Sequence, residues 1–268
     1  MVVRTLDAPK THDVPQLKLG AILLMFAWPA VWYTLLIYVL IQPLVRSADA
    51  VATWLQLLII VLGTGAEGLA GLLLLRREGY PLRLRALRER IRWQWPRGWK
   101  AWAVALVVLV AGVALSMAAG PLNQALARTP GFVPPAWWPA GSNPLAEVNG
   151  AADVFPDVNL AGNWGFIVLY MAIGLVFNIF GEEIYYRGYL LPRMRGAFGA
   201  WDWVANGVLF TLKHVYQRWL YPAIFVGGIA FAFAAGPLGS LPLAMLYHWV
   251  GNFLFQLIFL VQAALGIG

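Results

Sequence analysis

Residues 175–194 read LVFNIFGEEIYYRGYLLPRM, a mostly apolar stretch that carries charged residues. Glu182 and Glu183 follow an apolar run directly, and Arg187 stands four residues after the second glutamate. An apolar helix of this length can span a bilayer, where a charged group is costly and by default marks function. The stretch therefore predicts a membrane helix that contains a candidate functional site.

Composition extends this prediction to the whole chain. Of its 268 residues, 61% are hydrophobic and only 12% are charged, and the mean hydropathy is +0.69. A soluble domain of this size would expose too much apolar surface. We expect an all-α fold, a polytopic transmembrane bundle of about seven to eight helices. The expected spans are 19–45, 51–75, 99–120, 163–195, 201–219, 221–236 and 241–265.

Basic residues concentrate in one segment, 76–100, which the positive-inside rule places in the cytoplasm. The N-terminus, two spans earlier, is then also expected in the cytoplasm. The loop 121–162 carries Arg128 against three acidic residues and is expected outside. The prediction is a multi-pass integral membrane protein, of the plasma membrane or, in a prokaryote, the inner membrane.

The chain contains no cysteine, which excludes disulfides, thiolate metal sites and a cysteine nucleophile. Its net charge of +7 arises beside the spans, so we expect a lipid bilayer as partner and no nucleic acid. The sequence shows no internal repeat and no signal of oligomeric state. We expect N-terminal helices over 1–160 and a catalytic core over 161–268.

Several ionisable side chains lie at membrane depth. Of the three histidines, His12 lies in the polar tail, whereas His214 and His248 lie in apolar segments. Counted from the expected cytoplasmic ends of their spans, Glu182 lies about 16 Å, His214 about 20 Å and His248 about 10 Å deep. Asn252 shares a helix face with His248, one turn deeper. These depths predict that the four side chains meet.

Their chemistry suits the activation of water. A carboxylate beside a histidine can take a proton from water, and a second histidine and an amide can donate hydrogen bonds to an oxyanion. Glu183 and Arg187, spaced i and i+4, are expected to form a structural ion pair. Glu67, alone in the second span, is expected to have a packing or ion-pairing role, and Lys213 adjoins His214.

Small residues form a stripe along the second span. They are Gly63, Gly65, Gly68 and Gly71. Spacing of this kind favours close helix packing.

Three short motifs resemble those of the CPBP family, intramembrane proteases that include the type II CAAX prenyl endopeptidases and bacteriocin-processing or immunity relatives. EExxxR is matched in GEEIYYRG, FxxxH by Phe210 and His214 in LFTLKH, and HxxxN in HWVGN. The resemblance covers about residues 160–265. It implies hydrolysis of a peptide or protein substrate at the membrane, without a metal. Glu182 would act as base beside His214, and His248 and Asn252 would lie on the oxyanion side. It does not imply a prenylated CaaX substrate.

Other mechanisms and functions stay open. Glu182, His214 and His248 could bind a catalytic zinc ion, although HExxH is absent. The sequence favours neither a serine nor an aspartyl intramembrane protease. A non-catalytic scaffold or immunity protein could use the same groove, and a proton-coupled transporter could use the same groups, although the missing inverted repeat argues against transport.

Overall fold

The computed structural model describes residues 14–45, 52–79 and 83–267. These residues form helices and connecting turns, with no strand among them, which confirms the all-α prediction. His12 and the expected cytoplasmic N-terminus lie outside the described residues.

Six helical segments of the described chain are long and apolar enough to cross a membrane, so the protein is a multi-pass integral membrane protein. Several contain π- or 3₁₀-helical turns that extend an α-helix. The segments are Leu19–Leu44 with α1 (Leu19–Leu35), α2 (Thr53–Arg77), Trp99–Ala127 with α4 (Trp99–Ala118) and α5 (Gly120–Ala127), Trp164–Arg193 with α7 (Trp164–Ile173) and α8 (Phe180–Glu183), Val215–Ala235 with α11 (Tyr221–Ala235), and α12 (Leu241–Ala264).

The expected span 201–219 takes a different form. Its α-helix, α10 (Asp202–Lys213), has 12 residues, or about 18 Å, which is shorter than the roughly 30 Å apolar core of a bilayer. It ends where His214 and Gln217 leave helical dihedral angles. Helix α10 therefore ends inside the bundle, where it packs against α1 and α11.

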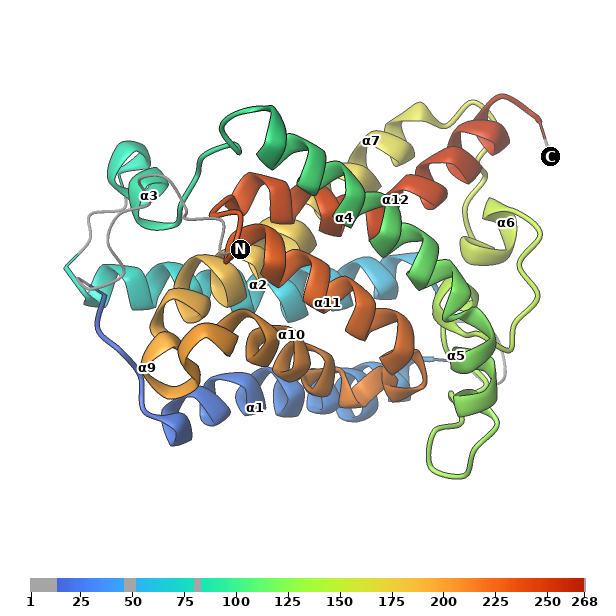
Figure 1. The fold of residues 1–268 in the computed structure, drawn as a ribbon. Helices are drawn as coiled ribbons and strands as arrows, with labels where there is room; N and C mark the ends of the chain where they lie inside the picture. The colour runs from blue at the N-terminus through green and yellow to red at the C-terminus, as the bar shows by residue number, and fades with distance from the viewer. Residues whose placement is uncertain (1–13, 46–51, 80–82, 268) are drawn as a thin grey trace.

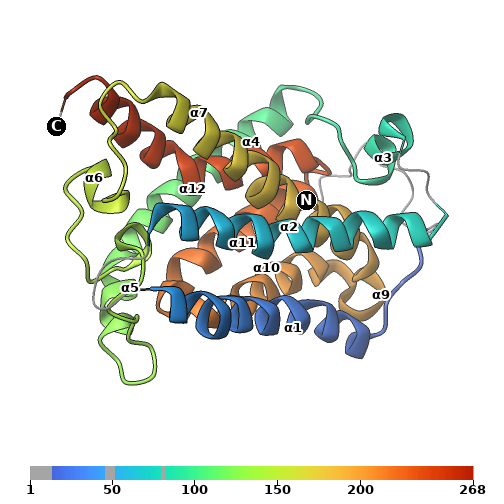
Figure 2. The same ribbon diagram turned by 180° about the vertical axis from the view of Figure 1, so that it is seen from behind.

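The bundle has two distinct ends. Figures 1 and 2 place α3 (Leu84–Arg90) and α9 (Arg195–Phe198) at one end and α5 and α6 (Ala151–Val154) at the other. We call the first the basic end, because it holds the segment 76–100, and the second the loop end. At the basic end, the N–H of Leu241 donates to the carbonyl of Arg92 at 3.1 Å. At the loop end, the N–H of Gly162 donates to Ala264 at 3.0 Å.

The glycine stripe of α2 brings it into backbone contact with the segment that contains Glu182. A Cβ atom on Gly68 would lie 2.7 Å from the Cα of Gly181, and one on Gly181 would lie 2.5 Å from the carbonyl oxygen of Thr64. A Cβ atom on Gly71 would lie 3.1 Å from the Cα of Tyr185. The prediction of close packing is confirmed, and α8 is fixed against α2 without intervening side chains.

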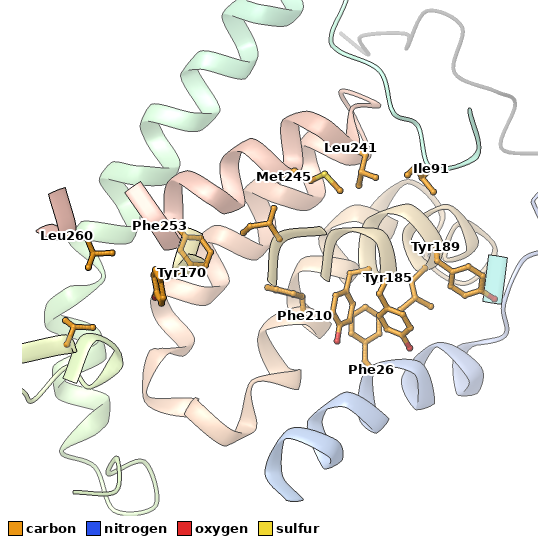
Figure 3. Packing of buried hydrophobic residues seen from close by; sticks show 14 of the residues in the cluster. Phe26, Ile91, Tyr170, Tyr185, Tyr189, Phe210, Leu241, Met245, Phe253 and Leu260 are labelled. Carbon is orange, nitrogen blue, oxygen red and sulfur yellow. The ribbon is translucent and has the colours of Figure 1, made fainter. Parts of the chain in front are cut away.

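Aromatic side chains fill much of the remaining core. Figure 3 shows Phe210 and Tyr185 near Phe26 of α1, and Tyr170 against Phe253 farther along the bundle. The last two rings lie 5.9 Å apart, centroid to centroid, in an edge-to-face arrangement. These contacts join α1, α7, α10 and α12 in one core around the site.

Candidate active site

Glu182 lies on α8, between two π-helical segments, and its side chain is almost fully buried. Its Oε1 accepts a hydrogen bond from the Nζ of Lys213 at 2.5 Å. Its Oε2 lies 3.4 Å from the Nε2 of His248. Local π-helical turns re-aim side chains along a helix and are frequent at functional sites. The Glu182 carboxylate is thus held between α10 and α12.

Lys213 joins Glu182 to a second carboxylate. Its Nζ also donates to the Oε1 of Glu67 at 3.1 Å, and the hydroxyl of Tyr186 donates to the same oxygen at 2.6 Å. The ion-pairing role expected for Glu67 is confirmed. Sequence reasoning did not find its partner, although a lone membrane carboxylate and a lone membrane ammonium are a signal that each needs the other.

The second glutamate of the motif lies away from the cavity. Glu183 is fully buried, and its Oε1 accepts from the Nη1 of Arg187 at 3.0 Å, which confirms the predicted i, i+4 ion pair. The Nδ1 of His248 lies 2.9 Å from the same oxygen. Arg187 also lies over the Phe210 ring, 4.1 Å from its centroid, and donates to the Gly228 carbonyl at 3.3 Å. His248 is therefore oriented by the two consecutive carboxylates.

His214 directly follows the last residue of α10. Its Nδ1 lies 2.7 Å from the carbonyl oxygen of Phe210, and because that oxygen only accepts, Nδ1 is the donor. In a neutral ring, Nε2 is then the acceptor. The His214 backbone N–H donates to Thr211 at 3.1 Å, and the Tyr221 hydroxyl donates to Leu212 at 3.3 Å. These bonds satisfy carbonyls that the end of a helix leaves open.

Asn252 lies one turn beyond His248 on α12, as predicted, and is exposed. Its Nδ2 donates to the Oδ1 of Asn178 at 3.0 Å. Sequence reasoning missed Asn178; its signal is the position four residues before Glu182, on the same helix face.

One cavity of about 680 Å³ receives all four sequence-predicted residues. Glu182, His214, His248 and Asn252 line it, together with Phe210. Glu183 and Arg187 stand behind this wall. Among the described lining residues, Glu182 is the only carboxylate, and none is a lysine or arginine.

Acidic and basic side chains are nearly matched in the buried cluster around Glu182. The cluster contains three carboxyl groups, from Glu67, Glu182 and Glu183, and two basic side chains, Lys213 and Arg187. Burying a charged group is costly unless it is paired, and each of these carboxyl groups has a basic partner.

A metal ion does not fit this arrangement. No group of three His, Asp or Glu side chains in the described part of the chain is disposed to bind one. The ammonium of Lys213, 2.5 Å from Glu182, occupies the place of a cation on that carboxylate.

Comparison with known proteins points to one family. Residues 163–254 match the family model described as "Type II CAAX prenyl endopeptidase Rce1-like". The matched segment contains Glu182, His214, His248 and Asn252. No curated protein and no solved structure matches the chain.

Proposed function

Since the chain belongs to the CPBP family of intramembrane endopeptidases, we propose that it hydrolyses a peptide bond of a membrane-associated substrate with water activated by Glu182 and His214. One observation carries this mechanism. Glu182 is the only carboxylate among the described residues of the cavity wall, and the histidines lie on that wall.

Glu182 acts as general base in this mechanism. It takes a proton from a water molecule as the water oxygen attacks the scissile carbonyl carbon. Lys213 and His248 hold the carboxylate from two sides, at 2.5 Å and 3.4 Å, and fix its direction. The free Nε2 of His214 can accept a hydrogen bond from the same water, because Nδ1 donates to Phe210.

His248 and Asn252 stabilise the oxyanion of the tetrahedral intermediate. His248 lies between the carboxylates of Glu182 and Glu183, and Asn252 lies one turn farther along α12. A ring N–H and an amide N–H can each donate a hydrogen bond toward a developing negative charge. When the C–N bond breaks, the proton taken by Glu182 passes to the leaving amine. Water is consumed, and a new carboxylate and a new amine are released.

The substrate of this reaction is a peptide or protein at the membrane, either CaaX-like or leader-bearing. The first 160 residues complete the bundle around a catalytic core at 161–268. Residues of α1, α2 and α4 support this division of labour, because they contribute to the wall of the same cavity.

The test compares cells that express the wild-type protein and Glu182→Gln at equal abundance. New peptide termini in membranes and medium are identified by proteomics, with and without a strong chelator. We expect termini that disappear in Glu182→Gln and persist under chelation. The control is Glu89→Gln, which removes an exposed carboxylate and should keep them.

Each other outcome selects an alternative. Termini lost under chelation would favour a zinc mechanism. Identical termini in wild type and Glu182→Gln would contradict the proposal and favour a non-catalytic scaffold or immunity role.

A further inference from the structure

The cavity of the candidate active site extends toward one end of the bundle only. On α2 its lining runs from Gln56 to Thr64, near the start of the helix, and on α12 it runs from Tyr247 to Gln256. No described lining residue comes from 76–100, 183–209 or 232–246, the segments that include the helix ends and turns at the basic end. The space that begins at Glu182 therefore leads toward the loop end.

The rim of the cavity is built at the loop end. It includes residues 137–139 and 141–144 of the loop after α5, and Gln217 after α10. The Nε1 of Trp219 donates to the carbonyl of Ser142 at 3.0 Å, and the rings of Trp138 and Trp219 meet edge to face at 4.8 Å. These contacts hold the rim in place.

Exposed lining residues mark the opening. Met117 on α4 is 64% exposed and Phe255 on α12 is 48% exposed, and both lie in the halves of their helices nearer the loop end. Gly141, on the rim, is also exposed. The cavity opens between α4, α12 and the loop after α5.

Charge orients this opening relative to the membrane. Exposed basic side chains are concentrated in the segment 76–100 at the other end of the bundle: Arg76, Arg77, Arg83, Arg85, Arg88, Arg97 and Lys100. Between α5 and α7 the chain carries one basic residue, Arg128, against Glu147, Asp153 and Asp157. Basic segments next to membrane helices face the cytoplasm, so the loop end faces away from it.

The chemistry of the lining indicates what can enter. Glu182, His214 and His248 are its only titratable acid or imidazole groups among the described residues, and they lie together at the deep end. The other polar groups are hydroxyls and uncharged amides, the latter from Gln56, Asn123, Asn143, Asn178, Gln217, Asn252 and Gln256. Amides can pair with a peptide backbone, whereas a charged side chain would lose its hydration here without a counterion.

We propose that the substrate reaches Glu182 from the non-cytoplasmic side, through the opening at the loop end, as an extended stretch of uncharged residues. This inference rests on the endopeptidase function proposed above. A segment displayed on the cytoplasmic face, such as a C-terminus modified there, would approach the basic end, where no described residue lines the cavity.

The absence of cysteine allows a direct test with the full chain. Three single-cysteine variants are made: Asn143→Cys on the rim, Glu147→Cys on the same loop outside the cavity lining, and Arg85→Cys at the basic end. A bulky, membrane-impermeant maleimide is added to sealed membrane vesicles of each orientation. Labelling and the formation of Glu182-dependent termini are measured before and after.

We expect the maleimide to reach residues 143 and 147 only from the non-cytoplasmic side and residue 85 only from the cytoplasmic side. Modification of Asn143→Cys should lower the yield of cleaved product at least about tenfold relative to the same unmodified variant. Modified Glu147→Cys and Arg85→Cys should keep their activity. The residues that flank the cleaved bonds should be uncharged.

Labelling of Asn143→Cys from the cytoplasmic side would overturn the proposal. So would full activity after complete modification, or cleavage beside charged residues. If no terminus depends on Glu182, the endopeptidase function fails, but the labelling pattern still decides the side on which the cavity opens. The two failures are thus distinguishable.

Discussion

Two clusters of carboxylates and cations lie at different places in this bundle. On the cavity wall, Glu182 lies between Lys213 and His248. At the basic end, Glu78 accepts from the Nε of Arg193 at 2.7 Å and pairs with Arg90 at 3.3 Å. In both clusters one carboxylate lies between two basic side chains.

The clusters differ in what lies in front of the carboxylate. The Glu182 side chain lines a cavity of about 680 Å³, whereas Glu78 lies outside the described lining of that cavity and connects the chain after α2 to Arg193. The same residue types therefore suit catalysis at one place and structure at the other. What separates the two clusters is access to a substrate-sized space.

The largest effect is expected at Glu182. Glu182→Gln keeps the shape and a hydrogen-bond acceptor for Lys213 but removes the general base, so turnover should fall by about 10²–10⁴-fold. Glu78→Gln should leave turnover within about twofold of wild type. Cleavage rates of both purified variants check this. Losses of similar size at the two positions would contradict this difference between the two clusters.

A smaller loss of turnover is expected when α8 is pushed away from α2. A Cβ atom on Gly68 would meet the backbone of Gly181, next to Glu182, at 2.7 Å. A displacement of about 1 Å can cost about 10²-fold in rate, so Gly68→Ala should lower kcat by up to that factor. The control is Gly20→Ala, because nothing lies within 4 Å of a Cβ atom there. Equal rates for the two variants would contradict the tight contact.

Stability at low pH should depend on Glu78. Partial burial alone would raise the pKa of Glu78, but hydrogen bonds and charges from Arg193 and Arg90 outweigh it and lower that pKa. The stabilisation is complete above the ordinary glutamate pKa, about 4.3, and is lost as the pH falls through the lowered value.

The unfolding midpoint in detergent, measured against pH, checks this. At neutral pH, Glu78→Gln should lower the free energy of unfolding by roughly 1–3 kcal/mol, and that difference should shrink on acidification. Glu89→Gln, which removes an exposed pair with Arg85, is the control and should change little. A difference that grows toward low pH would contradict the assignment.

The smallest effect is expected from metal removal. The ammonium of Lys213 already occupies the cation position at Glu182, so prolonged dialysis against a strong chelator should change turnover by less than about twofold. Activity lost on dialysis and restored by zinc would favour a zinc mechanism at Glu182.

Much of the site could be predicted from sequence, because polar groups at similar depths in membrane helices face the interior of the bundle and pair there. Glu182, His214, His248 and Asn252 line one cavity, as their depths indicated. The partner of Glu182 could not be found in this way. Spacing gives directions within one helix, but the contact with Lys213 depends on how α10 is rotated against α8.

The end of α10 was also missed. The chain leaves helical geometry at His214 without a glycine or proline nearby, so hydropathy predicts that the span continues. The carbonyls freed there are bonded by side chains nearby in the sequence, that of Phe210 by the His214 ring and that of Leu212 by the Tyr221 hydroxyl. Hydropathy registers neither contact.

His214 therefore has two roles of different kinds. Its ring closes the end of a helix that stops in the membrane, and the same ring stands on the cavity wall. Selection for folding alone would preserve this histidine after activity is lost, whereas Glu182 would be free to become glutamine. Among related proteins that have lost activity, Glu182 should be substituted before His214. A retained His214 therefore does not show that a relative is active.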